Sequence, residues 1–338
     1  MLLFYIVGWM IFSQSILLRV FTCCKRKRRL DSHSHRANKK HLSPWSILSA
    51  HRGGSLERLE NTNSAFQFAI EQGSDLLECD VQMTKDGVVI VAHDDDLKRL
   101  CGIDRKIEEF NYEELPLIKR SITTHFSEGE YQLLDHENGK FTTLREMFEI
   151  SQYKMISIDL KNASEEISDK VNELIKEFKR ENLTIWGSMF PSQHKKIGKL
   201  NPNIPQFFSG GQTLTVYLLY YLGLLFLYPL PSDAFMVPLF TQEKLKLFSG
   251  AFKKRGRGGL LGHMIIILMG VLIGNSKNLY RHLRKRGVIV VVWVLNEESE
   301  FQEALDYAPE IDGVMTDSPQ KLREFVEKYN LTYIPKYE

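Results

Sequence analysis

Cysteine is scarce in this sequence, and the few cysteines do not form a recognisable pattern. Cys23 and Cys24 are adjacent, Cys79 falls within an expected strand and Cys101 stands alone. This spacing argues against a disulfide framework and a CxxC metal site. The sequence also lacks basic patches interleaved with aromatic residues, zinc-ligand spacing and a helix-turn-helix pattern, which argues against nucleic-acid binding.

The sequence also lacks a strong excess of positive or negative charge, except in one short basic segment. The net charge is +2, and the basic residues are concentrated in the run KRKRR at 25–29 and just after it, so the rest of the chain is close to neutral. The chain has 338 residues, of which 43% are hydrophobic and 25% charged. This composition is typical of a globular protein, and the length suits a single α/β barrel.

The first segment of the chain predicts membrane attachment. Residues 1–22 are almost uncharged, and a segment of this length is about the shortest that can span a membrane. Residues 23–44 form a basic linker, and under the positive-inside rule its charges favour a cytoplasmic domain. No small-residue cleavage site follows the apolar run, so a cleaved signal peptide is disfavoured. Between this run and the basic residues, Cys23 and Cys24 could be palmitoylated or remain free thiols.

The orientation across the membrane stays open at this stage. Asn162, Asn182 and Asn330 each begin a glycosylation sequon, which matters only if the domain is luminal.

Strand and helix signals alternate through residues 45–330. Strand-like runs fall near 46–51, 75–82, 87–93, 154–161, 183–187, 204–208, 234–238, 288–295 and 311–316. Helical patterns fall near 61–72, 142–151, 164–181, 192–199, 276–286, 298–308 and 318–329. We therefore expect an α/β fold, a (β/α)8 TIM barrel with an irregular insertion near 94–140. A doubly wound open sheet is the alternative, but no GxGxxG follows the first strand.

Two stretches within the expected barrel are unusually apolar. Residues 212–231 and 259–275 carry no charge and would read as membrane spans by hydropathy alone. A span at the first stretch would put the strand near 234–238 across the bilayer from its neighbours, and a barrel cannot close that way. We expect both segments to dip into or lie on the bilayer, with ordinary buried helices as the alternative. Both follow strands, so the membrane surface and the active site are expected to share a face.

Acidic side chains alternate on the strand near 75–82. Glu78 and Asp80 point to the same face, where two carboxylates repel each other unless a cation neutralises them. Mg²⁺ or Ca²⁺ is the natural partner for such oxygens. On the strand near 154–161, Asp159 and Lys161 also share a face, and they either pair with each other or line a polar site.

Basic side chains follow other strand ends. His51 and Arg52 precede Gly53-Gly54, which bends the chain and allows a close backbone approach, and His93 ends the strand near 87–93. A His-Arg pair at such a bend can titrate near neutrality and hold an anion. A merely basic surface loop is the alternative for this pair, but charged side chains at so many strand ends favour an active site.

At this point the sequence resembles the glycerophosphodiester phosphodiesterase family. Its pattern of HRG, ENT, ExD, KDG, HD and E-x-K is matched by residues 51–53, 60–62, 78–80, 85–87, 93–94 and 159–161. WVLN at 293–296 and DGVMTDSP at 312–319 extend the match. The apolar N-terminus, HRGG and the hydrophobic insertion are similar to the membrane-anchored lysophospholipase D branch.

The resemblance implies a metal-dependent phosphodiesterase on an internal membrane such as the endoplasmic reticulum. Its implied substrates are lysophosphatidylcholine and N-acylethanolamine lysophospholipids, cleaved to lysophosphatidic acid and the head-group alcohol. One Mg²⁺ or Ca²⁺ would be held by Glu78, Asp80 and Asp159. The oligomeric state stays unknown.

The implied roles divide the remaining residues into two groups. His51 is assigned as the general base and His93 as the acid that protonates the leaving alcohol. Arg52 and Lys161 would neutralise charge on the phosphate, Glu60 would hold Arg52 or a metal-bound water, and Trp293 would form an apolar wall. Strand parity allows only one of Trp293 and Asn296 to reach the site, unless the strand ends between them.

Two departures from the family pattern stand out. Asp159 replaces the more usual Glu, which puts the affinity for the metal in doubt, and residues 55–59 (SLERL) lack a proline before Glu60. A glycerophosphodiesterase, a sphingomyelin-type phospholipase D and an inactive lipid-binding scaffold are the competing hypotheses. Attack by the substrate's 2-hydroxyl and attack by water are both open.

Overall fold

The computed structural model describes residues 47–124, 130–134, 138–161, 165–239, 241, 276–308 and 310–331. The expected membrane segment at 1–22, the basic linker at 23–44 and the apolar stretch at 259–275 lie outside these residues. No helix among the described residues is both long and apolar enough to cross a membrane.

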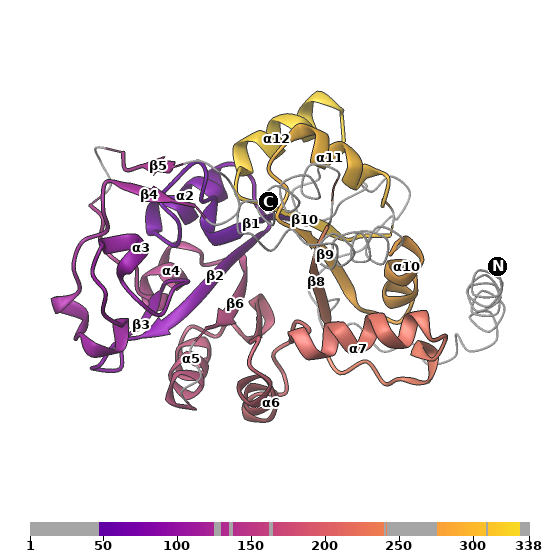
Figure 1. The fold of residues 1–338 in the computed structure, drawn as a ribbon, viewed down its shortest axis with the longest axis horizontal. Coiled ribbons are helices and arrows are strands. Elements are labelled where there is room, and N and C mark those ends of the chain that lie inside the picture. The colour runs from indigo at the N-terminus through magenta and orange to yellow at the C-terminus, as the bar shows by residue number, and fades with distance from the viewer. Residues whose placement is uncertain are drawn as a thin grey trace, which may run out of the picture.

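A parallel sheet forms the centre of the molecule (Figure 1). Its path is β7-β6-β2-β1-β10-β9-β8, and each pair of neighbours is parallel. The strands are β1 (Ile47–Ala50), β2 (Leu76–Met83), β6 (Met155–Leu160), β7 (Thr184–Gly187), β8 (Ala234–Pro238), β9 (Ile289–Trp293) and β10 (Gly313–Thr316). A further strand, β3 (Val89–Val91), pairs antiparallel with the end of β2. These strands confirm the expected alternation.

Residues 206 and 207 nearly close this sheet into a barrel. Gln206 forms a parallel bridge to Trp186 of β7, and Phe207 forms one to Ala234 of β8. The strand expected near 204–208 is therefore present only as isolated bridges. Pro205 has no N–H to donate to a ladder, which limits the pairing on one side.

Apolar side chains fill the inside of the barrel. The inward cluster contains Ile47, Leu76, Ile185, Phe207, Ala234, Ile289, Val291 and Met315. Along β2 the inward positions continue from Leu76 to Glu78 and Asp80, so the lining changes from apolar to acidic towards the carboxyl end. The same change along β1, β6 and β10 gathers polar groups at the C-terminal face of the barrel.

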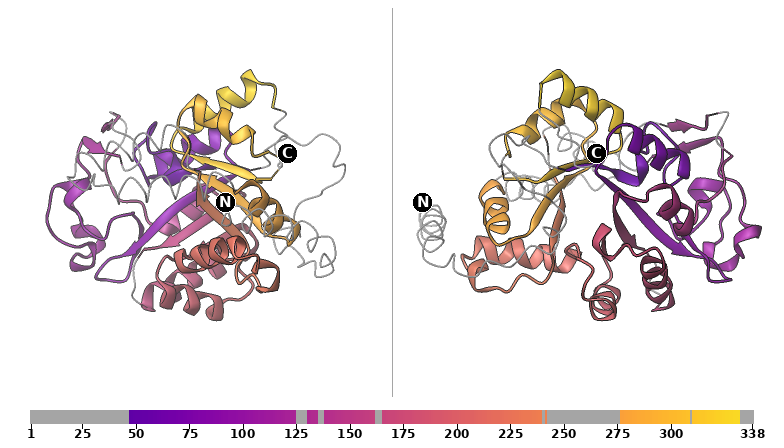
Figure 2. Two further views of the ribbon diagram at one scale, coloured as in Figure 1. Left: turned by 45° about the vertical axis from the view of Figure 1, so that its right-hand side comes forward. Right: turned by 180° about the vertical axis from the view of Figure 1, so that it is seen from behind.

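Helices surround the sheet on its outside (Figures 1 and 2). They are α2 (Asn63–Glu71), α4 (Leu144–Ile150), α5 (Glu165–Glu177), α6 (Pro191–Leu200), α7 (Gly210–Tyr221), α10 (Lys277–Lys285), α11 (Glu298–Leu305) and α12 (Pro319–Lys328). Helix α7 begins just before the apolar stretch expected at 212–231 and covers its first half, and a 3-10 turn, η6 (Leu225–Leu227), follows it. This stretch is thus the crossover between residue 207 and β8.

The insertion near 94–140 is more ordered than the sequence suggested. Its described part contains α3 (Lys98–Cys101), the 3-10 turns η3 (Ile107–Glu109) and η4 (Tyr112–Glu114), and the antiparallel pair β4 (Ser121–Thr123) and β5 (Glu130–Gln132). Scattered apolar residues of this segment pack into a small core of their own with Leu59 and Ile90. Such short elements have too few residues to show a period in the sequence.

Candidate active site

Three carboxylates meet at the ends of two neighbouring strands. Asp80 on β2 lies directly opposite Asp159 on β6, and Glu78 is one inward position below Asp80. Lys161 joins the pair, because its Nζ is 2.6 Å from Asp159 Oδ2 and 3.2 Å from Asp80 Oδ1. The structure thus shows the Asp159–Lys161 pairing and places both groups at a polar site.

The HRGG bend holds Arg52 against these acids. His51–Gly53 forms a single 3-10 turn, η2, in which Arg52 has left-handed angles of φ 52° and ψ 30°. Its backbone N–H donates to Glu78 Oε2 at 3.0 Å, and its Nε lies 3.2 Å from Asp80 Oδ2. Gly53 follows at φ +78°, where a Cβ would lie 2.7 Å from Cβ of Ala65. The first glycine is therefore required by both backbone conformation and close approach to α2.

His51 is held by an aspartate from the far end of the chain. Its Nδ1 lies 2.7 Å from Asp317 Oδ1, just beyond β10, and its Nε2 lies 3.9 Å from Glu78 Oε2. Ser55 Oγ donates to the same Asp317 oxygen at 2.5 Å, and Asn296 Nδ2 donates to the other at 3.0 Å. The imidazole is thereby fixed with one nitrogen towards the carboxylates of β2.

His93 has a similar arrangement at the other side of the site. Its Nδ1 lies 2.8 Å from Asp94 Oδ1, and 27% of its side chain is exposed, against 10% for His51. The strand geometry places it beside the acids, since the N–H of Ala92 donates to the carbonyl of Asp80. Two histidines, each oriented by a carboxylate, thus flank the acidic centre.

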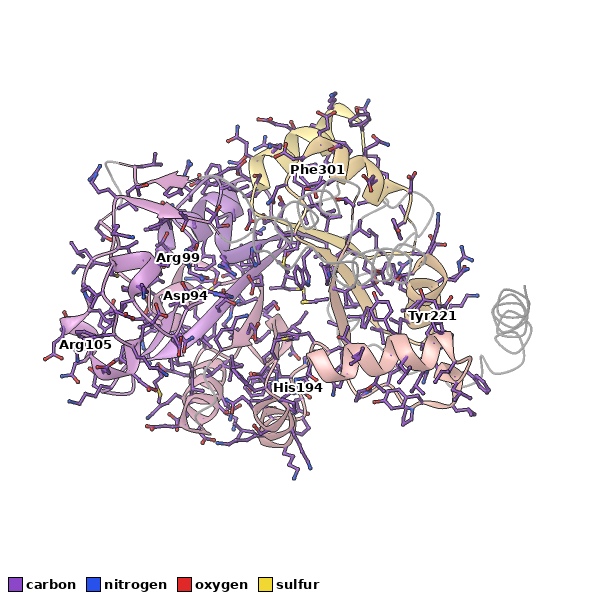
Figure 3. All side chains as sticks on the ribbon, viewed as in Figure 1. Asp94, Arg99, Arg105, His194, Tyr221 and Phe301 are labelled. Carbon is purple, nitrogen blue, oxygen red and sulfur yellow. The ribbon has the colours of Figure 1, made fainter. Side chains whose placement is uncertain are left out.

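Arg99 of α3, which lies beside Asp94 (Figure 3), links the groups around His93 to those around Arg52. Its Nε donates to Asp94 Oδ2 at 2.6 Å, and its Nη1 and Nη2 donate to the two oxygens of Glu60 at 2.8 and 2.7 Å. Glu60 Oε1 also accepts from Arg52 Nη1 at 3.2 Å, so the expected contact between Glu60 and Arg52 is present. A bidentate Arg–carboxylate pair fixes both orientation and distance.

The ENT motif begins α2 and braces the same groups. Asn61 Nδ2 donates to Asp80 Oδ2 at 3.3 Å, and its own N–H donates to the carbonyl of Arg52. Thr62 caps the helix by accepting from the N–H of Ala65. Each member of the motif therefore has a separate contact.

The unusual loop SLERL also has a structural explanation. Ser55 donates to Asp317, and the carboxylate of Glu57 accepts from the backbone N–H groups of Gln320 and Lys321 in the first turn of α12. Leu59 packs into the core of the insertion. The loop thus ties the bend to α12 and to the insertion without a proline.

Burial and charge set the protonation of the acids. Burial and the nearby Asp80 raise the pKa of Glu78 to about 7. Burial also raises the pKa of Asp159, with a contribution from Asp80 that opposes that of Lys161. For Asp80, burial is outweighed by Lys161 and Arg52, which hold the pKa of that carboxyl below its usual range.

The two histidines shift in opposite directions. Burial disfavours the charged form of His51, but Asp317 outweighs it and raises the pKa of the imidazole. Burial lowers the pKa of His93 more than its hydrogen bond to Asp94 raises it. At neutral pH the proton is therefore held more firmly by His51 than by His93.

The donor set has the chemistry of a hard-cation site. Asp159 Oδ1 is buried and has no hydrogen-bond partner, and burial, together with the neighbouring Asp80, raises the pKa of Glu78. Carboxylate oxygens are the ligands that Mg²⁺ and Ca²⁺ prefer. Across the described residues, no group of three or more His, Cys, Asp or Glu is arranged as a ready-made metal site. Lys161 and Arg52 instead contact these acids.

The WVLN motif places two side chains in the region. Trp293 ends β9 and packs, partly buried, against the apolar barrel lining, while Asn296 holds Asp317. The strand ends between them, which is the condition under which parity allows both to approach the site.

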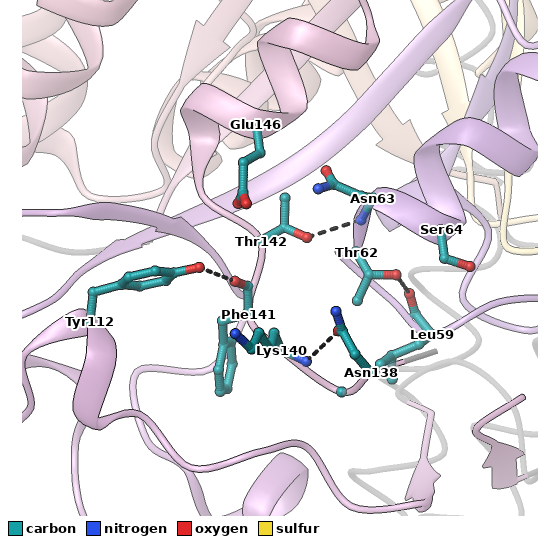
Figure 4. A pocket seen from close by; sticks show the side chains of 11 residues that line it. Leu59, Thr62, Asn63, Ser64, Tyr112, Asn138, Lys140, Phe141, Thr142 and Glu146 are labelled. Atoms are coloured by element: carbon teal, nitrogen blue, oxygen red, sulfur yellow. Dashed lines mark hydrogen bonds between the residues drawn. The ribbon is translucent and has the colours of Figure 1, made fainter. Parts of the chain in front are cut away.

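A separate pocket lies where the insertion meets the start of α2 (Figure 4). Leu59, Thr62, Asn63, Tyr112 and residues 138–142 line it with Ser64 and Glu146. The N–H of Asn63 donates to Thr142 Oγ1 at 2.9 Å across it. None of the catalytic candidates lines this pocket.

The sequence analysis singled out the acids, the histidines, Arg52 and Lys161, and the structure brings them to one end of the barrel. It assigned no role to Asp317, Asp94 or Arg99. The first two lie within the motifs TDSP and HD, so their position after a strand was a usable signal. Arg99 had no such signal, because its partners are set by the fold of the insertion.

Comparisons with known proteins agree with this arrangement. The glycerophosphoryl diester phosphodiesterase family matches residues 51–321. Human "Lysophospholipase D GDPD1" is 34% identical over 324 residues, covering 96% of this chain and 96% of that protein. Mouse "Lysophospholipase D GDPD3" is 36% identical over 282 residues, covering 83% of this chain and 82% of that protein.

Solved structures show the same fold. The glycerophosphodiester phosphodiesterase from Thermotoga maritima superposes with a TM-score of 0.52 at 26% identity, covering 85% of this chain and 99% of that one. A glycerophosphoryl diester phosphodiesterase domain from Mycobacterium tuberculosis gives a TM-score of 0.59 at 16% identity, covering 83% and 99%.

Proposed function

This chain belongs to the glycerophosphoryl diester phosphodiesterase family, and from that premise we propose that it is a lysophospholipase D. The proposed substrates are lysophosphatidylcholine and N-acylethanolamine lysophospholipids, and the products are lysophosphatidic acid and the head-group alcohol. The observation that carries the proposal is the pair of carboxylate-held histidines on either side of Glu78, Asp80 and Asp159. The 34% identity to the human lysophospholipase D, over nearly the full length of both chains, supports lysophospholipids as the substrate class.

The chain's own residues supply phosphate binding and proton transfer. Arg52 and Lys161 lie beside the acids and would neutralise the charge that grows on the phosphate oxygens. One histidine removes the proton of the attacking hydroxyl or water, and the other protonates the head-group oxygen as its bond to phosphorus breaks. Attack by the substrate's 2-hydroxyl would give a cyclic phosphate, whereas attack by water would give lysophosphatidic acid directly.

We propose that Glu78, Asp80 and Asp159 hold one divalent cation, Mg²⁺ or Ca²⁺. When bound, such an ion polarises a phosphate oxygen as a Lewis acid. The unpartnered Asp159 Oδ1 supports the assignment, and Lys161 balances part of the same charge.

Choline release from lysophosphatidylcholine tests the proposal. We expect EDTA to abolish release and added Mg²⁺ or Ca²⁺ to restore it, and His51→Ala and His93→Ala each to lower turnover by at least about 10²-fold. Silence with every divalent cation would favour the inactive lipid-binding scaffold. Release of choline from glycerophosphocholine but not from the lysolipid would favour a glycerophosphodiesterase.

We also propose that α7 and η6 contact the membrane. Large apolar side chains are exposed along them, with relative exposures of 70% for Leu214, 57% for Leu218, 46% for Leu222, 45% for Leu224 and 68% for Leu227. Contiguous apolar exposure is uncommon on soluble proteins. The 12 residues of α7 rise only about 18 Å, less than the bilayer core of about 30 Å, so this helix lies on the membrane. Its start, after residue 207, is at the active-site face.

Quenching by brominated lipids tests this contact. Bromine on acyl chains quenches indole fluorescence only on contact, so the Leu218→Trp variant in vesicles is expected to gain a quenched component. Tyr153→Trp is the matched control, because Tyr153 is 74% exposed but precedes β6 at the opposite end of the barrel. Equal quenching of the two variants, or none in the first, would contradict the proposal.

A further inference from the structure

Two adjacent apolar side chains are exposed at the rim of the active site. Met189 is 56% and Phe190 42% exposed, although methionine and phenylalanine are usually buried. They follow β7, whose last residue, Gly187, lies opposite Asp159. Ser188 Oγ donates to the carbonyl of Leu160 at 2.8 Å, which holds this loop against the end of β6. Met189 is thus only two residues, about 7 Å of extended chain, beyond the level of Asp159.

Helix α7 continues this apolar rim. Gly210, its first residue, has no side chain, and a Cβ there would lie 2.7 Å from Cε of Met189. The methionine therefore lies directly over the first turn of α7. Leu214 and Leu218 stand four and eight residues after Gly210, so they lie on nearly the same side of the helix. Met189 therefore lies between the end of β7, beside Asp159, and the exposed leucines of α7, with Phe190 next to it in the chain.

We infer that Met189 and Phe190, with Gly210 and Leu214, form an acyl-chain subsite. This inference rests on the proposed lysophospholipase D activity and names the part of the substrate that the phosphodiester residues do not bind. In a lysophospholipid the acyl ester is joined to the phosphate through the glycerol, a few bonds away, so the chain must leave the site across its rim. The subsite lies between the phosphate-binding groups and the proposed membrane surface. Deacylated glycerophosphodiesters would not use it.

The double variant Met189→Gln/Phe190→Ser tests the subsite. Glutamine keeps the length of methionine. Residue 190 is the N-cap of α6, where serine is a preferred residue, so helix formation is not impaired. Tyr153→Ser is the matched control, since it removes an exposed aromatic side chain (74% exposed, against 42% for Phe190) at the far end of the barrel.

Chain-length dependence is the readout. Full burial of a methylene changes affinity about fourfold, so partial burial is expected to raise kcat/KM by about twofold per methylene. With the full chain in lipid nanodiscs, we expect kcat/KM of the wild type to rise at least about tenfold from hexanoyl to dodecanoyl lysophosphatidylcholine, below their critical micelle concentrations. The double variant should lose most of this rise and keep glycerophosphocholine hydrolysis within about twofold, while Tyr153→Ser behaves as wild type.

The possible failures are distinct. A double variant with the wild-type chain-length dependence, or one that loses glycerophosphocholine hydrolysis equally, overturns the subsite. If the wild type releases choline from no substrate with any divalent cation, the proposed function fails instead. The subsite can then still be tested by measuring the binding of hexyl and dodecyl phosphate by calorimetry. Equal dissociation constants for the two ligands in the wild type would overturn it, and so would the same dissociation constants in the wild type and the variant.

Discussion

At the scale of single residues, the site uses carboxylates to orient cations and imidazoles. Asp317 holds His51, Asp94 holds His93, and Glu60 holds Arg52. A side chain with one nitrogen bound in this way keeps its other nitrogen pointed in a set direction. The entropic cost of orienting that nitrogen is therefore met before the reaction begins. The chemistry therefore depends on residues that do not touch the substrate as much as on those that would.

The order of the two histidines can be assigned with an activated leaving group. We expect His93→Ala to lose at least about 10²-fold in turnover on lysophosphatidylcholine, but much less on p-nitrophenyl phosphorylcholine, because nitrophenolate leaves without a proton. His51→Ala should lose activity on both substrates. The pKa directions taken alone favour the opposite order, so rescue of the His51 variant rather than the His93 variant would reverse the assignment.

Arg99 is expected to act as a positioning residue through Glu60 and Asp94. Arg99→Ala should lower kcat more than it raises KM, since it frees both the Arg52 and the His93 sides of the site at once. Added guanidinium should restore part of the loss, and Arg99→Lys should keep more activity than alanine. Arg105→Ala is the control: Arg105 belongs to the same insertion and pairs with Glu109 on the surface. Equal loss in both variants would show a general effect on folding.

At the scale of elements, the turn η2 decides whether the site can form. Its left-handed Arg52 turns the backbone N–H towards Glu78, and Gly53 lets the turn pack on α2. Neither feature is stable alone, because a left-handed non-glycine residue costs free energy that only surrounding contacts can offset. The contacts from Glu60, Asn61 and Asp317 provide that support.

Substitution of Gly53 tests this element. Gly53→Ala should lower the free energy of unfolding by about 1–3 kcal/mol and reduce turnover, because the new Cβ meets Ala65 at a positive φ. Urea denaturation and choline release measure the two effects. Gly211→Ala in α7 is the control, since a Cβ there has nothing within 4 Å, and its stability should rise slightly. An unchanged Gly53 variant would contradict the packing argument.

At the scale of the whole molecule, the barrel separates stability from chemistry along β1, β2, β6 and β10. Inward side chains near the starts of these strands are apolar, and charged side chains follow at or just beyond their ends. The apolar layer supplies burial, and the charged layer is stabilised by mutual pairing and by the helices that follow the strands. The outer leucines of α7 lie outside both layers and remain exposed.

A buried histidine outside the active site is expected to make the free energy of unfolding depend on pH. His282 of α10 is buried, and Arg286 Nη1 donates to its Nε2 at 3.5 Å. Burial, and then Arg286 and Lys285, lower its pKa to about 4. The folded state therefore prefers neutral His282. Its contribution is fully present above the unfolded pKa of about 6.5 and is lost as pH falls towards 4, on the order of 3 kcal/mol.

Comparison with a variant isolates this contribution from other titrations. In urea denaturation, the stability advantage of the wild type over His282→Gln should be constant above pH 7 and should shrink between pH 6.5 and pH 4. A difference in unfolding free energy that stays constant over this range would contradict the assignment.

Much of the molecule could be predicted from local pattern. The strand and helix alternation gave the barrel, and the parity of β2 and β6 put Glu78, Asp80, Asp159 and Lys161 on the inner face. Helix α7 was not among the predicted helices, because it is apolar on nearly every side and lacks the one-sided hydrophobic period of a surface helix. The insertion itself was predicted, but the elements inside it were not, since they are too short for any period to appear.

The sequence by itself determined which residue types stand at the strand ends, because strand parity and turn chemistry are local properties. Only the tertiary structure decided their partners. Asp317 reaches His51 because β10 lies beside β1, and Arg99 reaches Glu60 because the insertion folds back over α2. Met189 meets Gly210 because the segment through Gln206 and Phe207 runs parallel to β7 and returns the chain to the same rim. These contacts join segments far apart in the chain, and no local interaction specifies them.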